Sequence, residues 1–102
     1  MRLHHAHSWD VTPTEAVAVQ RRLCGTVVTT DDLPAVQWIA GVDVGFEQNG
    51  AVTRAAVAVL RFPELVPEES VVARRPTAFP YIPGLLSFRE VPAVLDALSQ
   101  LR

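Results

Sequence analysis

The sequence contains no lysine, a single cysteine and no long apolar run. All nine positive charges are arginine, and eleven acidic residues bring the formal net charge to −2. No overall basic field therefore draws the chain to nucleic acid, and any phosphate contact must be local. The lone Cys24 forms no internal disulfide and offers no thiolate cluster for zinc. No apolar stretch approaches the roughly 20 residues that span a bilayer, and the amino-terminal residues do not resemble a signal peptide. These absences predict a soluble, cytoplasmic protein.

What is present is the composition of a folded domain. The chain has 102 residues, of which 49% are hydrophobic and 20% are charged. This length accommodates one small domain, or one piece of a larger one. A domain this small buries a core that is only marginally self-sufficient.

The order of secondary structure follows from capping, turn and periodicity signals. Thr12, Pro13 and Glu15 form a helix start with a capping box, and Gly25 ends that helix. Asn49-Gly50 is a strong hairpin signal. After the first helix we expect three strands, over residues 36–46, 51–62 and 70–75, and a last helix over residues 90–101. The connections are a turn at residues 48–50, a loop at residues 63–69 and a proline-rich loop at residues 78–84.

Two details of burial follow from these assignments. The strand over residues 36–46 is apolar at both odd and even positions, which predicts cover on both faces. Cys24 and Trp38 are expected to be core residues.

Asp43 is unusual because it places a carboxylate in the middle of that apolar strand, between two valines. A buried, unpaired carboxylate costs several kcal/mol, so it needs a cation, hydrogen-bond donors or a metal. One interpretation is an aspartate that pairs with an arginine or is simply exposed. The other is a metal ligand on a rigid strand.

Glu90 allows two interpretations as well. Ser87 and Glu90 have the spacing of a capping box. Pro92 argues against it, because its missing N–H is tolerated best in the first turn of a helix. A helix that begins near Glu90 would leave its carboxylate free to point away from the backbone.

Tyr81 lies among the prolines of Pro80–Gly84, which stiffen the loop. A tyrosine held out on such a loop suits stacking on a nucleic-acid base or insertion into a base step. The alternative is a tyrosine folded back onto the core. Arg74, Arg75 and Arg89 are candidates for phosphate contacts or simply for surface polarity.

Two stretches, Ile39–Phe46 and above all Phe79–Glu90, resemble endonuclease V, the deoxyinosine 3′-endonuclease of DNA repair. The resemblance implies a ribonuclease-H-like α/β fold, a mixed sheet whose first three strands form an antiparallel meander followed by a helix. It also implies hydrolysis of the second phosphodiester bond 3′ to deoxyinosine in DNA, with Mg²⁺ or Mn²⁺. Some relatives act on inosine in RNA.

The resemblance extends to individual residues. Asp43 and Glu90 fall on two catalytic, metal-binding carboxylates of the family. Tyr81 falls on the wedge that fills the gap left by the extruded base, and Gly45 stands where a serine is expected. The residues that fall on the wedge and on the pocket for the flipped base are Pro80, Tyr81, Ile82, Pro83, Gly84 and Leu86.

Residues 1–102 are thus expected to be the amino-terminal part of a single endonuclease V-type domain. A further carboxylate of the family lies on the strand after this last helix, so we expect little or no cleavage by this chain alone. The full-length family is expected to be monomeric, whereas an open apolar strand edge allows self-association of this chain. A non-catalytic nucleic-acid-binding module and a non-functional truncated product are the alternatives.

Overall fold

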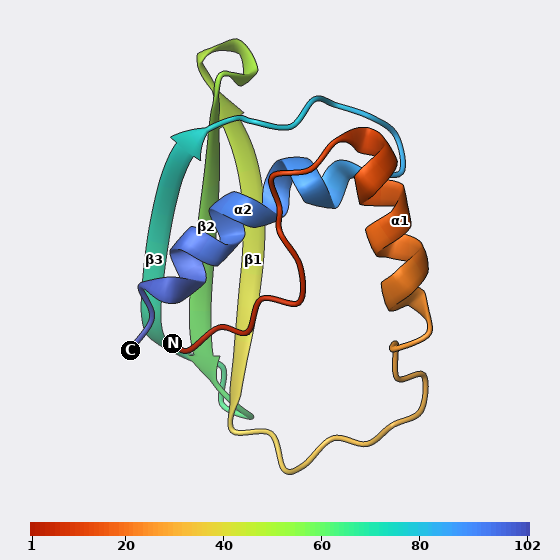
Figure 1. Cartoon of the computed structure of the whole chain (residues 1–102). Helices are drawn as coiled ribbons and strands as arrows, with labels where there is room; N and C mark the ends of the chain where they lie inside the picture. Colours follow the sequence, from red (N-terminus) through yellow and green to blue (C-terminus); the bar gives the residue numbers. More distant parts are fainter.

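Three antiparallel strands form a meander in the order β1-β2-β3, and one helix lies across it (Figure 1). The computed structural model describes residues 1–102. The elements are α1 (Pro13–Cys24), β1 (Trp38–Glu47), the short 3-10 helix η1 (Gln48–Gly50), β2 (Val52–Arg61), β3 (Val66–Pro76) and α2 (Leu86–Ser99). This arrangement confirms the expected helix, three-stranded meander and following helix.

Local signals fix two of the boundaries. Glu15 N–H donates to the Thr12 hydroxyl, and Thr12 N–H donates to the Glu15 carboxylate, so the predicted capping box begins α1. The hairpin between β1 and β2 turns through Gln48, Asn49 and Gly50, with φ values of 53°, 55° and 91°. Asparagine and glycine tolerate this left-handed region, which explains why Asn-Gly marks the turn.

The main core lies between the sheet and the carboxyl-terminal half of α2. Small side chains at the contact allow the helix to approach the strands closely. The buried members of this cluster are Ala55, Val57, Ala73, Ala93, Ala97 and Leu101. Val44 of β1 packs against the same cluster, so the even-numbered positions of β1 face α2.

A second, smaller core holds α1. It contains Ala16, Phe79, Leu85 and Phe88, with Trp9 and other partly buried side chains around them. Trp9 and Phe88 lie with ring centroids 5.3 Å apart, and Phe79 and Phe88 lie 5.7 Å apart. The amino-terminal half of α2 extends past the edge of β1 toward this cluster (Figure 1). Helix α2 therefore belongs to both cores.

The predicted start of the last helix was wrong. Helix α2 begins at Leu86, not near Glu90, and Pro92 lies inside it. Buried Leu85 and Phe88 anchor its first turn, and Leu85 N–H donates to Ile82 O at 2.9 Å. This burial outweighs the single backbone hydrogen bond that Pro92 cannot donate.

The start of the third strand was also wrong. Strand β3 begins at Val66, inside the segment predicted to be a loop, because β2 is long enough to pair with it from Val52 to Arg61. The pairing shifts register between Val59 and Leu60, and a bulge of this kind is invisible to periodicity.

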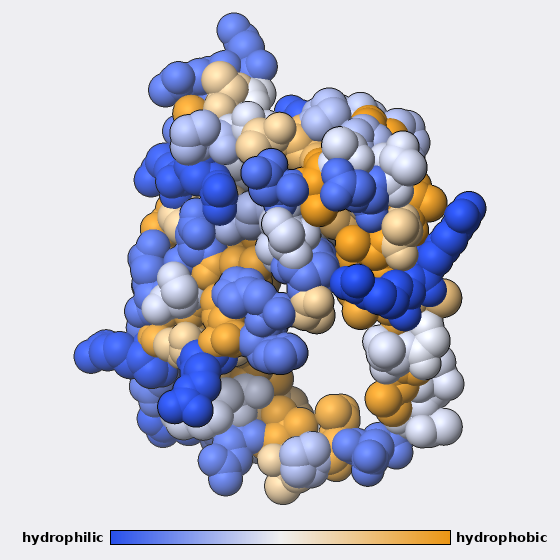
Figure 2. Space-filling model, in the orientation of Figure 1, coloured by the Kyte–Doolittle hydropathy of each residue, from blue (hydrophilic) through white to orange (hydrophobic).

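The expectation of cover on both faces of the first strand was wrong for this chain. Strand β1 is an edge strand, and Trp38 and Val42 are 50% and 48% exposed. Cys24 is also exposed, contrary to the prediction of a core residue. Apolar side chains border the opening between residues 26–37 and the rest of the molecule (Figure 2). No helix has the length and hydropathy that a bilayer crossing requires.

Candidate functional site

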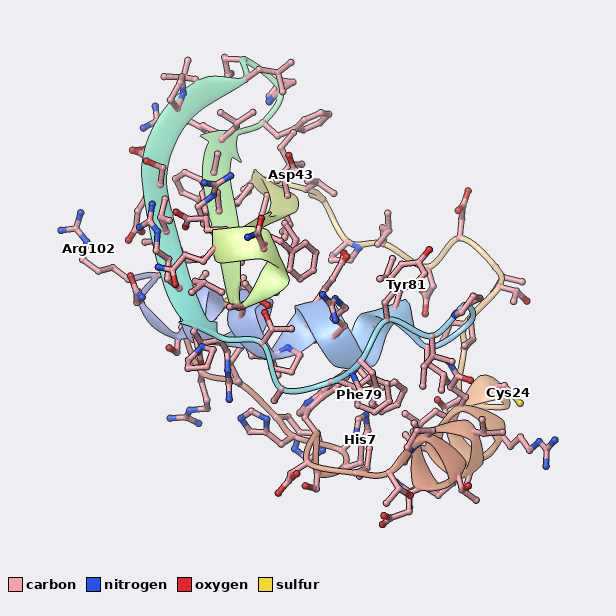
Figure 3. All side chains as sticks on the ribbon, turned by 90° about the horizontal axis from the view of Figure 1, so that it is seen from above. His7, Cys24, Asp43, Phe79, Tyr81 and Arg102 are labelled. Carbon is pink, nitrogen blue, oxygen red and sulfur yellow. The ribbon has the colours of Figure 1, made fainter.

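Residues 78–85, here called the Tyr81 loop, connect β3 to α2. Phe79 and Leu85 are buried in the second core, and Ile82 packs against them. Tyr81 lies between these anchors and is 70% exposed. Figure 3 shows Phe79 beside His7 on one side of the loop and Tyr81 on the other side. The loop therefore holds Tyr81 away from the core, and the alternative of a tyrosine folded back onto the core was wrong.

Two side chains from two helices hold the ends of the Tyr81 loop. Arg89 Nη1, on α2, donates to Phe79 O at 3.0 Å. Gln20 Nε2, on α1, donates to Gly84 O at 2.8 Å. Gly84 has a φ of 86°, a conformation that L side chains rarely adopt. The loop is thus fixed at both ends by hydrogen bonds and by the buried side chains of Phe79 and Leu85.

The other predicted residues of the wedge and base pocket surround Tyr81. Pro80, Pro83 and Gly84 are exposed on the same loop, and Leu86 is 44% exposed at the first position of α2. The structure therefore places the predicted wedge and pocket residues in one continuous surface segment. Their roles stay predictions.

The arginines that were candidates for phosphate contacts are largely engaged within the protein. Arg74 Nε lies 2.7 Å from Glu47 Oε1, and Arg75 Nη1 lies 3.3 Å from Asp96 Oδ2. The Arg89 guanidinium lies 4.7 Å from the centroid of the Phe46 ring. Arg89 thereby links α2 to both β1 and the Tyr81 loop. Four arginines have no acidic partner, namely Arg2, Arg21, Arg22 and Arg89.

Asp43 is exposed in the middle of β1, and no arginine pairs with it. One carboxylate oxygen, Oδ1, accepts the Val44 N–H at 2.9 Å. Because side chains alternate along a strand and Val44 faces α2, Asp43 projects toward the opposite face. On that face Glu47 pairs with Arg54 and Arg74. Asp43 is thus a solvated carboxylate with an oxygen free to bind a ligand.

Glu90 lies near the start of α2 and is partly buried. It does not cap the helix, because α2 begins at Leu86 with Leu85 at the N-cap and without a side-chain cap bond. The side chains of α2 that form hydrogen bonds are Arg89, Asp96 and Ser99. The Glu90 carboxylate is therefore uncommitted, like the free oxygen of Asp43.

The donor chemistry of these two carboxylates fits a hard cation such as Mg²⁺, which prefers oxygen ligands and retains several waters. The number of donors is small, because no group of three or more His, Cys, Asp or Glu residues that could hold a metal ion is present. Asp43 and Glu90 lie on β1 and α2, which contact each other only slightly. Joint binding of one ion by both residues stays a prediction.

The contact of Gln20 was not predicted, because the helical pattern makes Gln20 one of the polar surface residues of α1. Its partner Gly84 is 64 positions away. No local signal announces such a contact, because nothing in the helix periodicity distinguishes a solvated glutamine from one that holds a distant carbonyl.

Comparison with known proteins matches this arrangement to one family. Residues 21–102 match the family described as Endonuclease V. Endonuclease V from Nostoc punctiforme is 52% identical over 103 residues, which cover the whole of this chain and 47% of that protein. The chain therefore spans about half the length of the curated relatives it matches.

Solved structures agree on the fold. The crystal structure of Endonuclease V from Streptomyces avermitilis has a TM-score of 0.80 at 39% identity, over 90% of this chain and 41% of that one. A Ciona intestinalis Endonuclease V (D234N), in complex with a 23mer DNA containing an inosine followed by a ribo-adenosine, has a TM-score of 0.74 at 23% identity. That likeness covers 87% of this chain and 40% of the other. The chain belongs to the endonuclease V family, and its fold is the corresponding part of the ribonuclease-H-like fold.

Proposed function

We propose that this chain is the amino-terminal part of a metal-dependent DNA-repair endonuclease that hydrolyses the second phosphodiester bond 3′ to deoxyinosine. The chain contributes two of the metal-binding carboxylates, Asp43 and Glu90, and the wedge, Tyr81. Inosine-containing RNA is a further substrate class to compare. The proposal rests on family membership and on the geometry of the Tyr81 loop.

The observation that carries the proposal is the contrast between Tyr81 and its neighbours. Phe79 and Leu85 are 6% and 5% exposed, whereas Tyr81 between them is 70% exposed. An exposed aromatic ring on a fixed loop loses little side-chain freedom when it stacks against bases. The Ciona relative bound to inosine-containing DNA shares this fold.

Base extrusion supplies the selectivity. Removing a nucleotide from the stack costs a few kcal/mol, and this cost is lowest at a poorly paired base such as a deaminated purine. An inserted Tyr81 ring restores part of the lost stacking, since base–aromatic stacking contributes about 1–3 kcal/mol. Pro80, Ile82 and Pro83 would frame the wedge, and Gly84 and Leu86 would border the extruded base.

Asp43 and Glu90 would hold the cation, Mg²⁺ or Mn²⁺. A bound divalent ion provides an activated water and neutralises charge on the attacking and leaving oxygens. The protein's own contribution would be two uncommitted carboxylates, Asp43 on β1 and Glu90 on α2. Because Asp43 projects from the face of the sheet opposite α2, joint binding would require the two side chains to meet around the exposed edge of β1. The remaining donors belong to the part of the family fold outside these residues.

A chimera tests this proposal. Residues 1–102 would be joined to the part of the Nostoc punctiforme relative that lies beyond the match, and the product incubated with a labelled duplex that contains one deoxyinosine. We expect cleavage at the second bond 3′ to the lesion with Mg²⁺ and none with a chelator. Asp43→Asn and Glu90→Gln should abolish cleavage but retain binding, and Glu64→Gln serves as the matched control. Unchanged cleavage in either variant would show that the assigned role is wrong.

A second candidate function for the chain by itself is lesion binding without cleavage. The shortage of metal donors favours it, because two carboxylates hold a hydrated cation only weakly. The chain alone should then prefer an inosine duplex over an undamaged duplex equally with Mg²⁺ and with a chelator. Equal binding of both duplexes would exclude lesion binding by the chain alone, and the remaining alternative would be a non-functional truncated product.

A further inference from the structure

Helix α1 is attached to the Tyr81 loop and its neighbours, not to the sheet. It makes no extensive contact with any strand. Its one buried residue, Ala16, lies in the second core with Phe79, Leu85 and Phe88. Its one side-chain hydrogen bond to a distant residue is the bond from Gln20 to Gly84. Helix α1 is therefore held by the Tyr81 loop and by the start of α2, not by the sheet.

We propose that α1 acts as a support for the Tyr81 loop and that Gln20 is a positioning residue for Tyr81. This inference rests on the proposed function, in which Tyr81 enters the base stack. In this role Gln20 would contact neither substrate nor cation. It acts through the backbone of Gly84, three residues beyond the ring that it positions.

The two ends of the loop differ in how they are held. At the amino-terminal end, Phe79 is buried and Arg89 also bonds its carbonyl. At the other end Leu85 is buried and its N–H bonds Ile82 O, but Gly84 before it is exposed and has no atoms within 4 Å of the place where a Cβ would lie. Glycine is the residue with the greatest backbone freedom. The Gln20 amide is the one side chain that bonds its carbonyl.

Because of this restraint, the loop loses its conformational entropy when the protein folds and not when it binds a ligand. A loop that is already ordered does not lose that freedom when Tyr81 stacks, and preordered groups bind more tightly for this reason. Gln20 is itself exposed, so its hydrogen bond contributes modestly to global stability. Removal of the bond should therefore free Tyr81 without unfolding the protein.

Fluorine NMR of this chain tests the restraint directly, because Tyr81 is the only tyrosine. Incorporation of 3-fluorotyrosine gives one resonance, whose relaxation reports motion of this ring. We expect Gln20→Ala and Gln20→Glu, which both remove the N–H donor, to narrow and shift the resonance. Gln100→Ala removes an exposed glutamine at the end of α2 and should change nothing. Identical relaxation in all four proteins would overturn the proposal.

The chimera described under the proposed function, mixed with a duplex that carries 2-aminopurine beside deoxyinosine, tests the consequence for binding. Gln20→Ala should weaken the fluorescence response about threefold to tenfold, the range for ordering one side chain. In a Tyr81→Ala background the same change should have no effect, because Gln20 acts through Tyr81. An equal loss in both backgrounds would overturn a positioning role.

The two measurements separate this inference from the proposed function. If the chimera with wild-type residues 1–102 gives no response to the inosine duplex, the proposed function fails, and the NMR comparison still decides whether Gln20 orders Tyr81. If wild type responds and Gln20→Ala leaves both the resonance and the response unchanged, the proposed function stands and the role of Gln20 is wrong.

Discussion

The guanidinium of Arg54 lies directly over Gly45, on the strand face that carries Asp43. A Cβ atom at Gly45 would lie 2.8 Å from Arg54 Nη2, closer than real Cβ contacts come. Gly45 thus leaves room for Arg54 to reach Glu47, with Nη1 and Oε1 3.8 Å apart. The family resemblance leads one to expect serine at position 45. Glycine there makes room for the side chain of Arg54, its partner on β2.

Replacement of Gly45 by serine should displace Arg54 but not disrupt the sheet. The clashing atom is the end of a flexible side chain, and an exposed ion pair contributes about 0–1 kcal/mol. We expect the free energy of unfolding to change by less than about 1 kcal/mol and to become less dependent on salt. Urea titrations at low and high salt measure both effects. Gly41→Ser, at a position with no atoms within 4 Å, is the control. A loss of several kcal/mol would contradict this account.

Tyr81 and Phe79 should respond in opposite ways to truncation. Tyr81→Ala removes an exposed ring and should leave the melting temperature nearly unchanged, but should weaken binding to an inosine duplex by about tenfold, within the range for one base–aromatic stack. Phe79→Ala removes a buried ring and should destabilise the fold by about 3–5 kcal/mol. Thermal unfolding and fluorescence anisotropy distinguish the two. A large drop in stability for Tyr81→Ala would show that its ring packs in solution.

Features set by neighbouring residues could be predicted from the sequence. The capping box of Thr12 and Glu15 and the turn at Asn49-Gly50 are local, and both occur where the sequence places them. The start of α2 could not be predicted, because it depends on the burial of Leu85 beside Ala16 of a different helix. Propensity favours a start near Glu90, and tertiary packing overrides it.

The candidate site shows the same division between local and long-range information. The prolines around Tyr81 indicate a stiff loop. Once Phe79 and Leu85 on either side are buried, the Tyr81 ring is left exposed. The contact of Gln20 with Gly84 is set only when α1 docks, so no window of sequence contains it. Asp43 looks buried in the sequence because its neighbours are apolar, but it lies on an edge strand and is exposed.

Thr53, at the start of β2, and Thr77, just after β3, form a hydrogen bond whose loss from one side should be costly. Thr53 is 1% exposed, and its Oγ1 lies 2.7 Å from Thr77 Oγ1. Thr77→Val leaves the Thr53 hydroxyl buried without a partner, which costs about 1–3 kcal/mol. The double variant Thr53→Val/Thr77→Val should recover part of this loss, because no unpaired hydroxyl remains. Additive losses in urea unfolding would show that the two hydroxyls are not coupled.

The capping box of α1 should make stability depend on acidity. The Thr12 backbone N–H, which donates to Glu15 Oε1 at 3.1 Å, and secondarily the Thr12 side chain lower the pKa of Glu15 below its ordinary value of 4.5. A lowered folded-state pKa contributes stability that is fully present above 4.5 and is lost as pH falls through the folded value. Glu15→Gln keeps an acceptor but does not titrate. The melting temperature of wild type should therefore fall relative to that of Glu15→Gln as pH drops below 4.5, whereas Glu64→Gln should follow wild type. Parallel curves for wild type and Glu15→Gln would mean that the capping carboxylate is not held in solution.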